Sequence, residues 1–204
     1  MIGNDIVDWE QAKRESNWQR KGFLAKIFTP SEQRYIREAS NPERMVWTLW
    51  SFKESVYKAN IRTRGNRIFA PQKIACQLST NQNKVAEGTA SYGTVYRIRA
   101  SLTEQYVSSV AFQEDDSFPH KEVVVSFDNV SYANQHARLH NQLVHDCATA
   151  LVVPLHTVCI HKNENGVPTL HVAGSLGQCI TIPVSLSHHG HYGAFVAAYS
   201  QHLF

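Results

Sequence analysis

Two stretches of the chain resemble each other, and this similarity constrains the fold more than any other feature of the sequence. Residues 100–112 and 184–198 each contain Ser-Leu followed by Thr or Ser, a short polar loop, a tyrosine, and a run of small apolar residues. In both halves this stretch follows a predicted helix and an earlier predicted strand. The pattern predicts an α+β protein of two related lobes in a pseudo-dimer, with any ligand in the cleft between them. A chance match of a few small residues is the alternative.

Each lobe is expected to pack an antiparallel sheet on a long helix. The strongest helix pattern begins at Ser40-Asn-Pro-Glu43, where Asn41 or Ser40 suits the cap and Pro42 the first turn. No Pro or Gly follows until Gly65, and apolar residues recur at helical spacing. These residues are Met45, Val46, Leu49, Phe52, Val56 and Tyr57.

Three charged residues lie in the middle of this helix. Glu54 and Lys58 are four residues apart and therefore neighbours on its surface, where such a pair is usually a weak, solvated contact. Trp47 and Trp50 precede them on the same side, so Glu54 is expected to border aromatic rings. Lys53 falls on the apolar stripe of the helix, where a cation needs an anion to meet it.

The remaining elements follow from period, caps and turn residues. A helical segment begins near Glu10, and another helix begins at Thr29, with Glu32 completing a capping box. The acidic segment 113–120 is the expected linker, which divides the chain into lobes 1–116 and 117–204. The Asn165-Gly166 pair predicts a hairpin. Strands are expected at 2–8, 73–78, 94–102, 106–112, 123–127, 157–161 and 167–172, and a second long helix at 131–151, with Tyr132, Leu139, Leu143, Cys147 and Leu151 on one face.

Composition indicates an ordinary globular protein, with 43% hydrophobic and 18% charged residues among 204. No apolar run approaches a membrane span, and the first residues lack the features of a signal peptide. The four cysteines are widely spaced without a CxxC, so we expect reduced thiols and a cytoplasmic protein.

The basic residues are concentrated in the first half, since seventeen of the twenty Lys and Arg residues occur by Arg99. This basic half suits a phosphate-bearing or acidic partner, but it is too dilute to indicate nucleic acid.

Three motifs together indicate a phosphate-handling site. Gly3-Asn-Asp5 places a carboxylate in the first strand, the long helix supplies Glu54 and two lysines, and Ser187-His188 supplies a hydroxyl and an imidazole from the other lobe. Two carboxylates beside lysines suit a Mg²⁺ ion that shares the oxygens of a phosphate ester. Their joint occurrence is far more specific than any one motif.

This combination resembles the 4'-phosphopantetheinyl transferase superfamily. The matching motifs are Gly3-Asn-Asp5, Phe28-Thr-Pro-Ser-Glu32, Trp50-Ser-Phe-Lys53-Glu54-Ser-Val-Tyr-Lys58, Phe69-Ala-Pro71, Gly166-Val-Pro168 and Ser185-Leu-Ser-His188. As in the short holo-acyl-carrier-protein synthases, the GxD and KE motifs come first, but those chains are about half as long. The chain is similar to the two-lobe, surfactin-synthetase-activating type with its lobes in reversed order.

The resemblance implies a holo-acyl-carrier-protein synthase activity, in which the phosphopantetheine arm of coenzyme A passes to a serine of an acyl or peptidyl carrier protein. It further implies that Asp5 and Glu54 hold Mg²⁺, and that Glu54 takes the serine proton directly or through a metal-bound water. Lys58 would offset charge at the bridging and leaving oxygens, and Lys53 would meet the phosphates. The resemblance therefore implies that the diphosphate is the anion that Lys53 needs.

From the other lobe, the resemblance implies that Ser187 and His188 contact the phosphates of coenzyme A, while Gly166 and Pro168 line the nucleotide. Val167 stands where the G-x-P motif often has lysine. The arginines at 62, 64 and 67 either replace that cation, with Arg64 among the expected substrate-binding residues, or form a solvated loop.

The metal site also departs from the surfactin type, which has an acid where this chain has Val7. Two protein ligands with water in the remaining positions are therefore expected. Asp8 is more simply a helix-start residue than a third ligand, although its role stays open.

Other interpretations carry less weight. His136 and His140 lie one turn apart and are expected on a surface face rather than at a metal site. Ser185 or Ser187 as a hydrolase nucleophile would need a GxSxG elbow, which is absent. The alternative function is a non-catalytic module that binds coenzyme A or a carrier protein. We expect a monomer that binds neither nucleic acid nor membrane.

Overall fold

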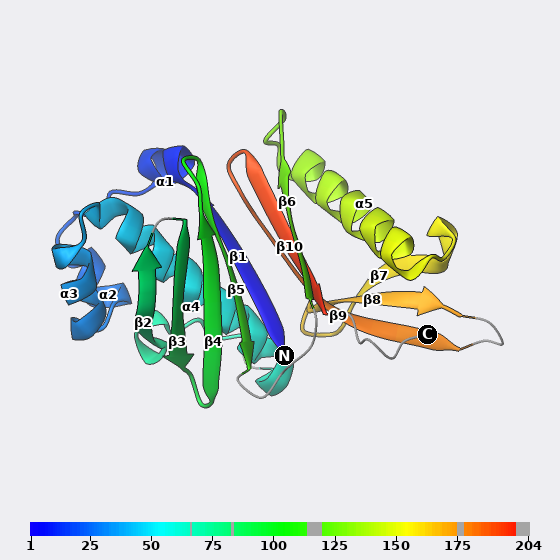
Figure 1. Ribbon diagram of the computed structural model, residues 1–204, viewed down its shortest axis with the longest axis horizontal. Coiled ribbons are helices and arrows are strands. Elements are labelled where there is room, and N and C mark those ends of the chain that lie inside the picture. Colours follow the sequence, from blue (N-terminus) through cyan, green and yellow to red (C-terminus); the bar gives the residue numbers. More distant parts are fainter. Residues whose placement is uncertain (66, 83, 114–119, 175–177, 199–204) are drawn as a thin grey trace.

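The computed structural model describes residues 1–65, 67–82, 84–113, 120–174 and 178–198 (Figure 1). The first half forms a five-stranded antiparallel sheet in the order β1-β5-β4-β3-β2. Its strands are β1 (Ile2–Asp8), β2 (Ala75–Gln82), β3 (Val85–Ser91), β4 (Val95–Leu102) and β5 (Tyr106–Gln113). The helices of this lobe are α1 (Trp9–Glu15), α2 (Phe23–Ile27), α3 (Pro30–Glu38) and α4 (Pro42–Arg64), with a 3₁₀ turn η1 (Pro71–Lys73).

The second half forms another five-stranded antiparallel sheet, in the order β6-β10-β9-β8-β7. Its strands are β6 (His120–Ser126), β7 (Val158–Lys162), β8 (Pro168–Ala173), β9 (Cys179–His189) and β10 (Tyr192–Ala198). The helix α5 (Tyr132–Leu151) packs on this sheet, and a 3₁₀ turn η2 (Leu155–Thr157) follows it. Within the described ranges, no helix is both long and apolar enough to cross a bilayer.

The two lobes share one topology, which confirms the α+β pseudo-dimer expected from the repeat. In each lobe the first strand pairs with the last, and the long helix lies between the first and second strands in sequence. Tyr106 and Tyr192 begin the equivalent strands β5 and β10, and their rings lie 4.8 Å apart. The repeated Ser-Leu pairs are offset by two residues between the lobes. Ser101 pairs with the third residue of β5, whereas Ser187, two residues after Ser185, pairs with the third residue of β10.

The lobes meet along β1, which lies against β9 and β10 of the second lobe. Each lobe keeps its own hydrophobic core, and a third small cluster of Ile2, Val110 and Val196 fills the space between the sheets. The boundary that we place between residues 116 and 117 lies outside the described residues.

Gly3 explains why α4 lies so close to β1. A Cβ at this position would stand 2.2 Å from the carbonyl oxygen of Ser55 and 2.4 Å from the amide nitrogen of Ala59. Both are backbone atoms of α4 that cannot move aside, so only glycine permits this approach. The glycine of the GxD motif thereby brings the middle of α4 beside Asp5.

The local capping signals are confirmed. Asn41 accepts from the amide of Arg44 to cap α4, and Gly65, at φ 67°, ends it in the left-handed region. Thr29 and Glu32 form the reciprocal capping box of α3.

Two expectations are wrong. The strand β3 lies between the expected strands 73–78 and 94–102, where we expected no strand. Its buried face consists of the small residues Ala86, Gly88 and Ala90, which give a weak strand signal. Tyr132 is 68% exposed and does not join Leu139, Leu143 and Cys147 on the core face of α5.

Candidate active site

A cleft between the lobes brings three of the predicted site residues together. It is a cavity of about 530 Å³ whose polar walls include Asp5, Glu54 and His188. Phe23, Ile27, Trp47 and Trp50 form its apolar side, so Glu54 borders aromatic rings as expected. Another cavity of about 460 Å³, near the start of α4, contains none of the predicted site residues.

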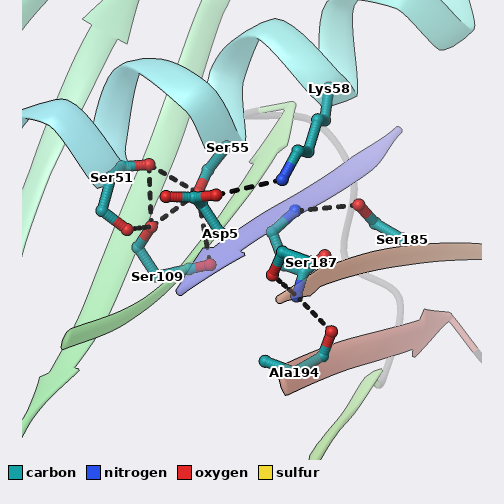
Figure 2. A network of polar contacts seen from close by, with 9 residues as sticks. Asp5, Ser51, Ser55, Lys58, Ser109, Ser185, Ser187 and Ala194 are labelled. Atoms are coloured by element: carbon teal, nitrogen blue, oxygen red, sulfur yellow. Dashed lines mark hydrogen bonds and ion pairs between the residues drawn. The ribbon is translucent and has the colours of Figure 1, made fainter. Parts of the chain in front are cut away.

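Asp5 and Lys58 form the centre of the site (Figure 2). Lys58 Nζ donates to Asp5 Oδ1 at 3.0 Å from the adjacent turn of α4. Burial raises the pKa of Asp5, and Lys58, the Ser51 hydroxyl and His189 oppose this increase. Among the described residues, the buried Oδ2 of Asp5 has no hydrogen bond of good geometry. One carboxylate oxygen therefore remains available to a ligand that the described residues do not supply.

Glu54 lies in the same cavity as Asp5, and the two carboxylates repel each other when both are charged. Burial and, to a smaller extent, the Asp5 carboxylate raise the pKa of Glu54 to about 7, with Lys58 opposing part of the increase. Two carboxylates with one partly compensating cation suit a hard divalent ion. In the described part of the chain, no cluster of three or more His, Cys, Asp or Glu side chains is arranged to hold a metal. The oxygen donors of Asp5 and Glu54 are of the kind that Mg²⁺ prefers.

Three serines form the layer beneath Asp5. The hydroxyls of Ser51 and Ser109 lie 2.7 Å apart, and Ser55 Oγ donates to the carbonyl of Ser51 at 2.8 Å. Ser109 also stands directly opposite Asp5 in the β1–β5 pairing. Small hydroxyl side chains let α4 pack on β1 and β5 while satisfying one another's polar groups (Figure 2).

Asn4 holds the lobes together from the opposite face of β1. Its backbone amide donates to Ser185 Oγ at 3.1 Å, and its side-chain amide donates to Ser187 Oγ at 3.0 Å and to the carbonyl of Ala194 at 3.1 Å (Figure 2). Successive side chains alternate across a strand, so β1 contacts the second lobe through Asn4 and the site through Asp5. Ser187 is buried in this contact. Its hydroxyl thus joins the lobes, and the expected contact between Ser187 and a phosphate stays a prediction.

Lys53 requires the clearest correction. Its side chain is fully buried, and Nζ lies 2.8 Å from both carboxylate oxygens of Glu32. It also donates to the carbonyls of Pro71 and Ile74. The anion that Lys53 needs is therefore Glu32, and the expectation that Lys53 meets the phosphates is wrong.

The arginines at the end of α4 take different directions. Arg62 donates to the carbonyl of Pro168 at 3.0 Å, and burial lowers its pKa to about 10. A Cβ on Gly166 would lie 3.6 Å from the guanidinium of Arg67, so the predicted nucleotide hairpin adjoins these two arginines. Arg64 instead donates to the carbonyl of Gly93 in its own lobe at 2.8 Å. The structure therefore brings Arg62, rather than Arg64, to the hairpin.

A row of rings continues from His188 along α5. Tyr132 meets His188 with ring centres 5.6 Å apart, and His136 and His140 stack at 3.8 Å. Burial, His136 and Lys162 lower the pKa of His140 to about 4. Burial, Lys58 and His136 also lower the pKa of His188. The two α5 histidines are thus partly exposed and belong to a row of rings that extends from His188.

The sequence reasoning did not identify Glu15 and His189 as cavity residues, although both line it. The only sequence signal was the His188-His-Gly-His191 run, in which the roles of the individual histidines depend on the strand register.

Comparison of the sequence with known proteins identifies the family of this chain. A family model of the 4'-phosphopantetheinyl transferase superfamily matches residues 1–121. A holo-[acyl-carrier-protein] synthase of Chlamydia muridarum is 30% identical over 117 residues, which cover 55% of this chain and 93% of that protein. The family match includes Asp5, Glu54 and Lys58 and extends over the whole first lobe. The chain belongs to the 4'-phosphopantetheinyl transferase superfamily.

Proposed function

We propose that this protein transfers the 4'-phosphopantetheine group of coenzyme A to a serine of an acyl or peptidyl carrier protein, with Mg²⁺ held by Asp5 and Glu54. The observation that carries the proposal is the carboxylate pair itself. Both groups line one cavity, and a buried oxygen of Asp5 remains without a hydrogen bond among the described residues. Family membership and the similarity to a holo-[acyl-carrier-protein] synthase support the reaction class.

The cleft offers distinct regions for the parts of the substrates. Lys58 and His188 supply donors for the diphosphate beside the carboxylates. The nucleotide half would extend toward Gly166 and Pro168, where Arg62 adds positive charge. The row of rings on α5 supplies flat aromatic surfaces next to that path. The pantetheine arm and the carrier serine would approach along the aromatic wall.

In the proposed reaction, the serine Oγ forms a bond to the phosphorus that carries pantetheine. The bond from that phosphorus to the bridging oxygen breaks, and adenosine 3',5'-bisphosphate leaves. Glu54 accepts the serine proton directly or through a bound water, and its pKa of about 7 suits a base at neutral pH. Lys58 stabilises negative charge that grows on the bridging oxygen. A bound Mg²⁺ would supply further positive charge at the diphosphate.

The two-lobe chain holds all of these groups on one polypeptide, because the first lobe supplies the carboxylates and Lys58 and the second supplies His188. We therefore propose a monomer in which the lobe 1–116 holds the metal and the lobe 117–204 holds coenzyme A. A cytoplasmic location would give it access to both substrates.

The test is to incubate the protein with coenzyme A, Mg²⁺ and a panel of apo carrier proteins, and to weigh the carriers by mass spectrometry. A gain of one phosphopantetheine group on the serine, lost when Mg²⁺ is chelated, would support the proposal. Binding of coenzyme A with no mass gain on any carrier would instead indicate the non-catalytic module.

A further inference from the structure

Asp8 is buried at the start of α1, and both of its carboxylate oxygens are engaged. Oδ1 accepts from the amides of Glu10 and Gln11 at 3.0 and 3.2 Å, which caps the helix. Oδ2 accepts from the amide of His191 in the second lobe at 2.9 Å. Asp8 is not among the residues that line the cavity of Asp5 and Glu54. These contacts give Asp8 a function that does not involve the metal.

His189 makes the reciprocal contact from the second lobe. Its Nδ1 accepts from the backbone amide of Asp8 at 3.1 Å, and its Nε2 lies 3.2 Å from Glu15 Oε2. Because Nδ1 accepts, the proton must be on Nε2, which donates to Glu15. Asp8 and Glu15 stand at the two ends of α1, so the β9–β10 turn at 189–191 holds this helix at both ends.

The turn is itself fixed within the second lobe. Gln135 Nε2 donates to the carbonyl of Gly190 at 2.7 Å, and the amide of Phe127 donates to the carbonyl of His191 at 2.8 Å. Gly190 has φ 56°, and a Cβ there would stand 2.4 Å from Asp8 Oδ2. The turn therefore approaches Asp8 as closely as a glycine permits. Because the turn is fixed to the second lobe, it fixes the position of α1 relative to that lobe.

We infer that Asp8 is a positioning residue that couples the lobes, and that it is not a third metal ligand. Together with the 189–191 turn it forms a clasp that sets α1 against His188. Ala12 and Glu15 of α1 line the same cavity as the aromatic wall. Because the proposed function brings the carrier serine in along that wall, the clasp would set the width of the cleft there. The part of this inference that concerns the metal rests on the proposed function.

Four variants of the full-length protein test the clasp. Asp8→Asn keeps the size of the side chain but replaces one acceptor with a donor, so either the cap or the contact to His191 is lost. Gly190→Ala disturbs the same contact from the other lobe while leaving the Asp8 carboxylate intact. Asp5→Asn removes a proposed ligand, and Asp128→Asn is a control on an exposed acid.

The first measurement is the affinity of each variant for Mn²⁺. Electron paramagnetic resonance detects the free ion and so reports how much is bound. We expect Asp8→Asn and Gly190→Ala to bind Mn²⁺ within about threefold of the unaltered protein, whereas Asp5→Asn weakens binding by at least tenfold. A loss in Asp8→Asn equal to that in Asp5→Asn would overturn the inference, because it would make Asp8 a ligand.

The second measurement is amide hydrogen exchange, which does not depend on activity or metal. Asp8→Asn and Gly190→Ala should each accelerate exchange in residues 9–15 and 189–191 by roughly tenfold or more, because a buried hydrogen bond is lost. Residues 143–148 in the core of α5 serve as the internal reference. Unchanged exchange in α1 in both single variants would reject the clasp.

The experiments distinguish a failure of the proposed function from a failure of the clasp. If the unaltered protein binds no Mn²⁺ and modifies no carrier, the proposed function is wrong, yet the exchange experiment still decides whether the clasp exists. If turnover is confirmed, both clasp variants should raise KM for the carrier more than KM for coenzyme A, because the proposed contacts of the diphosphate and nucleotide do not involve α1. The reverse pattern would contradict a role at the carrier side of the cleft.

Discussion

The ammonium group of Lys53 lies 2.8 Å from the carboxylate of Glu32, and both side chains are fully buried. Glu32 also accepts from the amide of Cys76, so one carboxylate joins α3, α4 and the start of β2. This pair lies in the core of the first lobe, and Lys53 belongs to the same helix as Glu54. Its role is to hold that helix in place.

Lys53→Met should therefore destabilise the protein. It leaves the Glu32 carboxylate buried without its cation, and we expect a loss of about 3–5 kcal/mol in the free energy of unfolding. Urea unfolding measures this loss, and the double variant Lys53→Met with Glu32→Gln should recover part of it. A stable Lys53→Met protein with weakened binding of coenzyme A would contradict the buried-pair interpretation.

Glu54→Gln should stabilise the metal-free protein at high pH. The folded-state pKa of Glu54, about 7, lies above its ordinary value of 4.5, so the folded protein binds the extra proton between these values. Stability therefore decreases as the pH rises from about 4.5 to 7, and the glutamine variant escapes this decrease. We expect a gain of about 2–3 kcal/mol at pH 8 and none at pH 4, measured by urea unfolding. Addition of Mg²⁺ should shrink the difference, and a variant that is less stable at pH 8 would refute the argument.

Lys58→Met should reduce turnover more than binding. Lys58 contacts Asp5 and lies beside the proposed path of the diphosphate, so its charge matters most as the leaving group departs. We expect kcat to fall by about 10²–10³-fold with a smaller change in KM for coenzyme A. The exposed Lys13→Met provides the control. An equal loss in both lysine variants would argue against a specific role for Lys58.

Arg62 and Arg64 form a matched pair for testing the nucleotide end of the cleft. Arg62 reaches Pro168 in the second lobe, whereas Arg64 turns to Gly93 in its own lobe. Arg62→Ala should raise KM for coenzyme A by roughly tenfold, the magnitude of a lost charge-assisted hydrogen bond. Arg64→Ala should change KM by less than about twofold. Steady-state kinetics at fixed carrier concentration decides between them, and a larger effect at Arg64 would place the nucleotide elsewhere.

Local chemistry made much of the fold predictable from the sequence. The caps at Asn41 and Thr29, the stop at Gly65 and the periodicity of α4 involve residues that are close along the chain. The repeat revealed two lobes because equivalent hairpins keep equivalent patterns. The strand β3 escaped prediction because its inward residues are small, and its burial comes from neighbouring strands rather than from its own side chains.

The site was predictable in its parts and not in their arrangement. The residue types at Asp5, Glu54 and Lys58 indicated metal and phosphate chemistry, and periodicity showed that Lys53 needed an anion. Which anion meets Lys53, which arginine reaches the hairpin and whether Ser187 or His188 faces the cleft depend on contacts between residues far apart in sequence. Periodicity determines which face of a helix or strand a side chain occupies, so the sequence alone determined most of the elements and the kind of chemistry. Only the tertiary packing of β1 on α4 and of one lobe on the other decided the partners, because burial and distance exist only in the folded chain.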